Sequence, residues 1–165
     1  MLCSLTLGLS TAHLLAADDI LDRSDKSFVT DSYQAGLAEI KMGEMGESKS
    51  SNADVKKFAS QMVADHTKAN TELKTLADSK KVELPTEPAL TSKAKAKWDE
   101  MKSGSDFDKA FAETMVSDHE KVVAAFEKAS KDAKDADVKA FATKVLPTLK
   151  DHLKMAQELQ AKVGK

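Results

Sequence analysis

The chain has 165 residues, and its 25 Lys and Arg against 27 Asp and Glu give a formal net charge of -2. This length suits one domain, and the interspersed charges form no broad basic surface for a phosphate backbone, so we expect no nucleic-acid partner. Only 6 Gly and 3 Pro occur among many Ala, Lys, Glu and Asp. This composition excludes a collagen, a disulfide scaffold and most β-sandwiches or barrels, and it predicts an all-α domain.

Residues 1–17 form the only long apolar stretch, MLCSLTLGLSTAHLLAA, which contains no charged residue and ends before Asp18 and Asp19. Such a stretch is typical of a secretory signal peptide, so we expect cleavage after Ala17 and a single domain over residues 18–165 in the periplasm or another exported compartment. The segment lacks the usual preceding positive charges, and an uncleaved anchor is the alternative. After cleavage, no transmembrane span and no cysteine would remain, because the only cysteine is Cys3. Disulfides and thiolate metal sites would then be excluded.

Apolar residues recur at helical spacing in four blocks, which predict helices over residues 27–50, 54–80, 106–131 and 137–163. The links within the first pair and within the second pair are short, so each pair should form an antiparallel hairpin. Ser51 or Asn52 is the expected N-cap of the second helix, because a side-chain oxygen there can accept a hydrogen bond from the first turn.

The connection between the two hairpins, from Lys81 to Ser105, is much longer than an antiparallel turn requires. It contains Pro85 and Pro88, followed by a stretch around residues 89–102 that favours a short helix and includes Trp98. A connection of this length can return along the bundle, so that the second and third long helices run in the same direction. One long crossover of this kind is typical of ferritin-like four-helix bundles, and this is the fold that we predict.

Three histidines follow the apolar N-terminal segment, and each lies near the middle of a different predicted helix: His66, His119 and His152. Projection at about 100° per residue points all three imidazoles toward the apolar face of their own helix, and therefore toward the bundle core. Their heights along the bundle differ by about one helical turn or less.

The first helix has no histidine, but Glu39 lies near its middle, with Gly36 and Gly43 one turn to either side. These glycines suggest that room is left for a carboxylate. Three neutral imidazoles and a carboxylate match zinc, or iron or manganese with water as a further ligand, and a divalent cation compensates a buried carboxylate. We therefore expect one divalent metal ion at the bundle centre, bound by Glu39, His66, His119 and His152.

Two further features of the histidine segments define the site. The residue three positions before each histidine is apolar, which disfavours a dinuclear centre built on Glu-x-x-His motifs. The residue directly before each histidine is an aspartate that projects about 100° away from it on the helix. These aspartates are expected to contact another helix or to orient another helix's histidine outside the direct ligand shell. They are Asp65, Asp118 and Asp151.

Five short segments that are spread along the chain form a pattern: AGLAEIKMG at 35–43, VKKFA at 55–59, MVADHT at 62–67, VSDH at 116–119 and LPTLKDHL at 146–153. In these segments the sequence resembles the bacterial domain-of-unknown-function family 4142. The resemblance implies a ferritin-like bundle that is exported in bacteria and is often labelled an outer-membrane protein, although no strand pattern supports that label. The recurrent polar positions of the family correspond here to Glu39, Asp65, His66, His119 and His152.

Neither the residue pattern nor the resemblance assigns a reaction. The sequence has no phosphate-binding loop and no nucleophile motif, and we favour a protein that is not an enzyme, although an open His/carboxylate site can activate water or oxygen. The alternative is a metal-free envelope stress or interaction protein in which the buried Glu/His cluster is structural. The sequence defines no partner protein and no oligomeric state.

The apolar segment leads to a first prediction. The chain isolated from the exported fraction should begin near Asp18 and lack Cys3, because signal peptidase removes such a segment. The intact mass of that material is the measurement. A mass that includes residues 1–17 would show an uncleaved anchor instead.

Overall fold

The computed structural model describes residues 21–88 and 103–164, and these contain four long helices and no strand. The helices are α1 (Arg23–Lys49), α2 (Ala53–Ser79), α4 (Ser105–Asp132) and α5 (Ala136–Val163). The predicted all-α class is confirmed, and the main difference is that α1 begins about one turn earlier than expected. The short helix predicted around Trp98 lies outside the described residues. None of the helices in the described part combines the length and apolar character needed to cross a bilayer.

Three of the four helices begin with a side chain that accepts hydrogen bonds from the first turn. Asp22 caps α1, Asn52 caps α2 and Asp135 caps α5. These oxygens satisfy backbone N–H groups that have no partner within the helix. The predicted role of Asn52 is therefore confirmed. Helix α4 instead follows Gly104, whose φ of 122° is a conformation that favours glycine.

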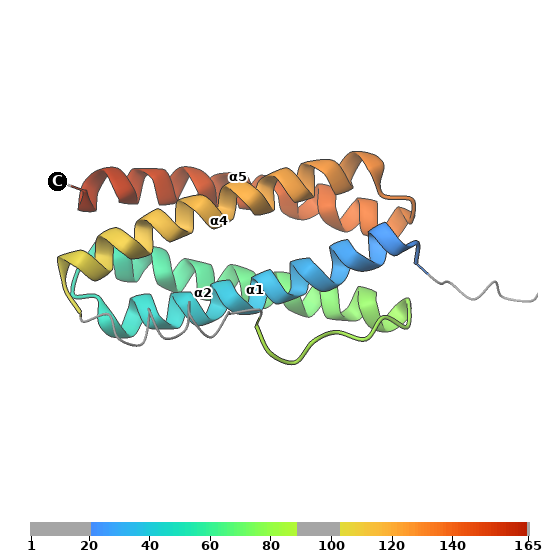
Figure 1. The fold of residues 1–165 in the computed structure, drawn as a ribbon, viewed down its shortest axis with the longest axis horizontal. Helices are drawn as coiled ribbons and strands as arrows, with labels where there is room; N and C mark the ends of the chain where they lie inside the picture. Colours follow the sequence, from blue (N-terminus) through green and yellow to red (C-terminus); the bar gives the residue numbers. More distant parts are fainter. Residues whose placement is uncertain (1–20, 89–102, 165) are drawn as a thin grey trace, which may run out of the picture.

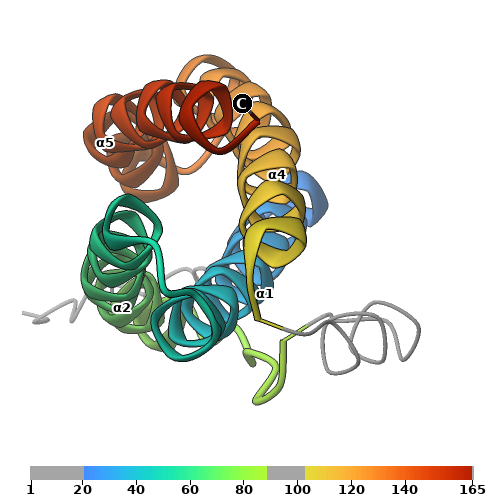
Figure 2. The ribbon, with the colours of Figure 1, turned by 90° about the vertical axis from the view of Figure 1, so that its left-hand side faces the viewer.

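The helices form two antiparallel hairpins, α1 with α2 and α4 with α5, which pack side by side (Figure 1). Viewed along the bundle, α1 adjoins α2 and α4, and α5 adjoins the same two helices (Figure 2). The Ser50 hydroxyl donates to the Asp108 carboxylate at 2.6 Å, which joins the end of α1 to the start of α4. At the opposite end, Lys80 after α2 pairs with Asp135 before α5 at 2.9 Å. Helices α2 and α4 therefore run in the same direction, which confirms the predicted crossover.

Two apolar clusters fill the interior, one toward each end of the bundle. Phe126, Phe141 and Leu149 belong to the cluster near the start of α1. Phe58, Phe107 and Phe111 belong to the cluster near the start of α2 and α4. On each of α2, α4 and α5, one buried histidine interrupts the apolar series between the two clusters. The centre of the bundle is thus a polar layer enclosed by apolar layers.

Glycines on α1 permit close contact with α2. A Cβ atom at Gly43 would lie 2.9 Å from the Ala59 carbonyl oxygen, and a Cβ at Gly36 would collide with the Asn70 side chain. The interpretation that these glycines leave room for the carboxylate of Glu39 is therefore wrong. Atoms of α2 fill the space beside these glycines, because α2 approaches α1 closely at the positions where α1 has no side chain.

A buried carboxylate joins the start of α1 to the link between α4 and α5. Asp25 is 3% exposed, and its Oδ2 accepts hydrogen bonds from the backbone N–H groups of Lys134 at 2.9 Å and Asp135 at 2.7 Å. Both of these N–H groups precede α5, so they make no hydrogen bond within a helix. One side chain thus fixes the two hairpins relative to each other at this end of the bundle.

We expect Asp25→Ala to lower the free energy of unfolding by about 2–3 kcal/mol, because hydrogen bonds to a charged group are lost and two N–H groups lose their acceptor. Urea denaturation followed by circular dichroism is the measurement. The control is Asp31→Ala, which removes an exposed carboxylate from the same helix and should change stability by about 0.5 kcal/mol or less. Equal effects of the two substitutions would contradict the proposed role of Asp25.

Candidate metal centre

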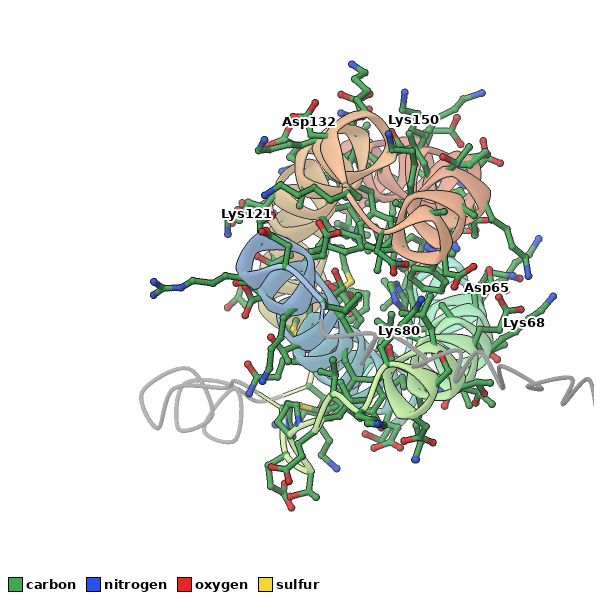
Figure 3. All side chains as sticks on the ribbon, turned by 90° about the vertical axis from the view of Figure 1, so that its right-hand side faces the viewer. Asp65, Lys68, Lys80, Lys121, Asp132 and Lys150 are labelled. Atoms are coloured by element: carbon green, nitrogen blue, oxygen red, sulfur yellow. The ribbon has the colours of Figure 1, made fainter. Side chains whose placement is uncertain are left out.

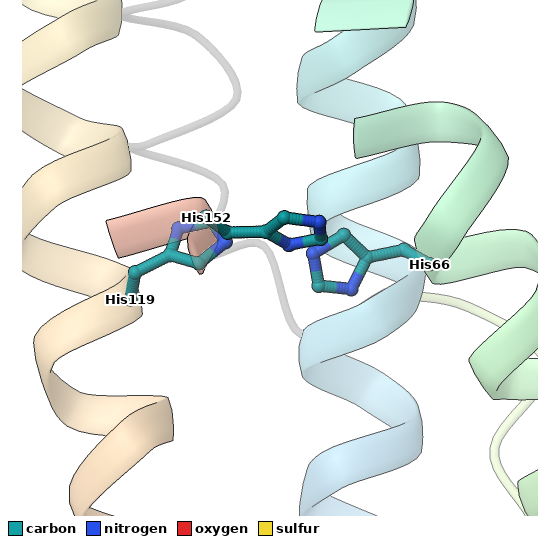
Figure 4. A group of neighbouring side chains, drawn as sticks. All are labelled: His66, His119 and His152. Carbon is teal, nitrogen blue, oxygen red and sulfur yellow. The ribbon is translucent and has the colours of Figure 1, made fainter. Parts of the chain in front are cut away.

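The three histidines meet at the middle of the bundle. His66 comes from α2, His119 from α4 and His152 from α5, and their exposed fractions are 6%, 1% and 3%. Their ring centroids are 5.4–5.7 Å apart (Figure 4). One candidate ligand nitrogen from each ring lies within 4.8 Å of the other two. The structure therefore brings these side chains from three helices to one point.

One nitrogen of each ring is buried and has no hydrogen-bond partner: Nε2 of His66, Nε2 of His119 and Nδ1 of His152. The other nitrogen of two rings is held in place. His119 Nδ1 lies 2.8 Å from the carbonyl oxygen of Met115, and His152 Nε2 lies 2.9 Å from Oδ2 of Asp65. Because these oxygens accept hydrogen bonds, we assign the ring protons to the two held nitrogens. The lone pairs are then left on the unpartnered nitrogens, as in histidine ligands of metals.

The surroundings keep His66 and His119 uncharged. Burial, together with the neighbouring His119 and His152, lowers the pKa of His66 to about 3. Burial also lowers the pKa of His119 to about 4, although its hydrogen bond to Met115 acts in the opposite direction. At neutral pH both rings are therefore neutral, which is the protonation state required of a metal ligand.

Asp65 orients the His152 ring from a neighbouring helix. Burial raises the pKa of Asp65, but hydrogen bonds from Gln61 and His152 outweigh this effect, so the pKa is lowered overall. The Gln61 side-chain amide donates to Asp65 Oδ2 at 2.6 Å. Asp65 is therefore a carboxylate that fixes the tautomer of His152. The sequence suggested such a contact with another helix's histidine but could not identify which one.

The other two aspartates lie at the surface. Asp118 pairs with Lys121 at 2.8 Å on the same helix, and Asp151 is exposed on α5. Figure 3 shows that many charged side chains point away from the bundle into solvent, including Lys121 and Lys150. Of the three predicted outer partners, Asp65 is the one whose carboxylate lies within hydrogen-bond distance of a histidine in the described part of the chain.

Glu39 lies beside the histidines but is not one of the three residues whose donor atoms lie within 4.8 Å of one another. Its exposed fraction is 4%, and its Oε2 has no hydrogen-bond partner. Burial, with a smaller contribution from the negative charge of Asp118, raises the pKa of Glu39 to about 8. The carboxyl group lines a small cavity together with His66 and His152. Without a cation nearby, Glu39 is therefore mostly protonated at neutral pH.

Asn70 is a buried polar residue near the site that the sequence analysis missed. It lies one turn after His66 on α2, is 7% exposed, and lines the same cavity. Its side-chain amide donates to the Tyr33 carbonyl oxygen of α1 at 3.1 Å. The i, i+4 spacing from His66 could have indicated this position, since residues four apart share a helix face.

The family model described as "Domain of unknown function (DUF4142)" matches residues 10–159. The chain belongs to this family. The match covers the four helices of the DUF4142 bundle almost completely and confirms the resemblance noted in the sequence. No curated protein matches the sequence.

Solved structures with the same architecture confirm the fold. A DUF305 fragment from Deinococcus radiodurans has a TM-score of 0.74 and 13% identity, covering 87% of this chain and 99% of that chain. CopM in the Cu(I)-bound form has a TM-score of 0.69 and 18% identity, covering 84% of this chain and 96% of that chain. CopM in the Cu(II)-bound form has the same TM-score and coverage at 16% identity. At these identities the similarity shows the four-helix fold alone.

The raised pKa of Glu39 predicts a specific pH dependence for the metal-free protein. Between pH 4.5 and about 8 the unfolded chain ionises this carboxyl group while the folded chain keeps it protonated. Glu39 therefore lowers the free energy of unfolding as pH rises, by up to about 1.4 kcal/mol per pH unit. Glu39→Gln should remove this contribution, because the amide does not titrate.

The measurement is denaturation of the wild type and of Glu39→Gln in the presence of chelator from pH 5 to 8. It gives the free energy of unfolding of each protein as a function of pH, and the difference between the two curves is the contribution of Glu39. The histidines contribute a slope of opposite sign below about pH 6.5, because protons there bind the unfolded chain preferentially. That slope is common to both proteins and cancels in the difference. Parallel curves for wild type and Glu39→Gln would show that Glu39 has no raised pKa.

Proposed function

We propose that this protein binds one divalent metal ion through His66, His119 and His152. Two observations carry the proposal: three buried histidines each have a ring nitrogen within 4.8 Å of the others, and each ring has one buried nitrogen with no hydrogen-bond partner in the described part of the chain. Each buried polar atom without a partner costs about 1–3 kcal/mol, and such atoms are uncommon in native proteins. One metal ion would satisfy all three nitrogens together.

Glu39 supplies the negative charge of the proposed site. Its neutral state reflects burial without a compensating cation, and a divalent ion nearby would favour the ionised carboxylate. Imidazole with carboxylate suits zinc, iron and manganese, which are the metals that the sequence suggested. CopM, which has a similar fold, is known in Cu(I)-bound and Cu(II)-bound forms, so copper is added to this set.

We further propose that the protein acts after export to the periplasm, with residues 1–17 removed. The uncharged apolar stretch and the Asp18-Asp19 pair that follows it support this proposal. These residues lie outside the described part of the chain. We assign no reaction and no catalytic residue.

Elemental analysis and thermal unfolding test the metal site directly. Metal-depleted protein should take up one equivalent of Zn²⁺, and its melting temperature should rise, because an ion that binds only the folded state adds about 2.7 kcal/mol at a hundredfold excess over Kd. His66→Ala, His119→Ala and His152→Ala should each abolish both stoichiometric uptake and stabilisation. Parallel titrations with Mn²⁺, Fe²⁺ and Cu²⁺ identify the preferred metal.

Two aspartates provide a matched comparison for this experiment. Asp65→Asn should weaken binding about 10–100-fold, because the amide cannot hold the His152 ring as the carboxylate does. Asp151→Asn makes the same chemical change at an exposed position next to the same histidine and should leave binding unchanged. If metal and chelator do not change the melting temperature while the histidine variants are merely destabilised, the cluster is structural and the proposal is wrong.

A further inference from the structure

A small interior cavity of about 40 Å³ adjoins the histidine cluster. Glu39, His66 and His152 line one part of it. Apolar side chains, among them Leu73, Phe126 and Val145, make up most of the remaining wall, together with the polar residues Ser32, Asp65, Asn70 and Thr148. One ordered water needs about 10–15 Å³ of such space, so the cavity accommodates a ligand of two or three atoms. It has no room for a large or strongly hydrated anion.

The proposed metal ligands leave one side of the metal open. Three protein ligands are the usual number where a fourth position is kept for water or another small molecule, whereas structural sites are closed by four protein ligands. His66 and His152 belong both to the cluster and to the cavity wall, so the cavity lies directly beside two of the three proposed ligands. A ligand in the cavity would therefore lie next to the metal.

Glu39 is an independent indication that a ligand belongs in this cavity. It is a polar side chain with 4% exposure that lines the cavity, and its Oε2 has no hydrogen-bond partner among the described residues. A buried carboxyl oxygen normally has a hydrogen-bond partner. A metal-bound molecule in the cavity would provide that partner.

We propose that the cavity binds a diatomic or triatomic ligand, uncharged or singly charged, that coordinates the metal and forms a hydrogen bond with the carboxyl group of Glu39. This inference rests on the proposed metal site and changes the expected role of Glu39 from a direct ligand to a hydrogen-bonding residue. The small volume of the cavity selects against larger molecules, and its mainly apolar wall disfavours multiply charged ones.

Azide and the Co²⁺-loaded protein provide the test. Co²⁺ replaces the unidentified metal and reports its coordination through its visible absorption bands. One equivalent of Co²⁺ should bind first, which tests the metal site by itself. Azide should then change the bands saturably with one azide per metal, whereas inorganic phosphate at the same concentration should leave them unchanged.

Two substitutions on α5 locate the azide. Val145→Phe fills the cavity and should weaken azide binding at least tenfold without changing Co²⁺ stoichiometry. Val163→Phe introduces the same group at an equally half-buried valine outside the cavity and should leave azide binding unchanged. Glu39→Leu should also weaken azide binding, and Glu39→Gln, which still donates a hydrogen bond, should restore much of it.

The possible failures are distinguishable. Absence of Co²⁺ binding in the wild-type protein would overturn the metal site and this inference together. Stoichiometric Co²⁺ binding with no spectral response to azide would overturn the inference alone, because the metal would then have no open position. An azide response that Val145→Phe does not weaken would place the ligand outside this cavity and would also overturn it.

Discussion

The burial of three imidazole rings at the centre of an apolar bundle is the constraint on which this structure depends. Each ring replaces an apolar core side chain, and each leaves one nitrogen without a protein partner. The cost is limited because two of the rings remain neutral: the pKa values of His66 and His119 lie well below neutrality. A core of this kind gains stability from any ion that can bind all three nitrogens. Under the proposed metal site, the metal-free chain would therefore be less stable than the metal-bound chain.

Convergence of the three rings requires that α2, α4 and α5 keep their relative heights, because a shift of one turn moves a side chain by about 5.4 Å. Polar contacts at both ends of the bundle fix these heights. Ser50 and Asp108 join the hairpins at one end, and Asp25 with Asp135 joins them at the other. The central layer lies between these contacts, so its geometry depends on interactions more than one helical turn away from it.

Much of this arrangement could be predicted from the sequence, and the remainder required knowledge of how neighbouring helices face each other. Helical periodicity is a property of one segment, so it indicated the inward direction of His66, His119 and His152. It could not show that Asp65 faces His152, because that contact depends on the rotation of α2 relative to α5. The error about Gly36 has the same origin: its space is filled by Asn70 of the adjacent helix.

The opposite pKa shifts of Glu39 and the histidines also determine how protons and metal compete. Protons do not compete effectively for His66 or His119 near neutrality, because both pKa values lie several units lower. They do compete at Glu39, whose pKa is about 8, so under the proposed metal site the binding of a divalent ion at pH 7 would be coupled to release of a proton from this carboxyl group. If Glu39 faces a small metal-bound ligand, that proton need not leave the cavity, since the ligand can accept it. The same carboxyl group would then couple metal binding, ligand binding and proton transfer at the centre of the bundle.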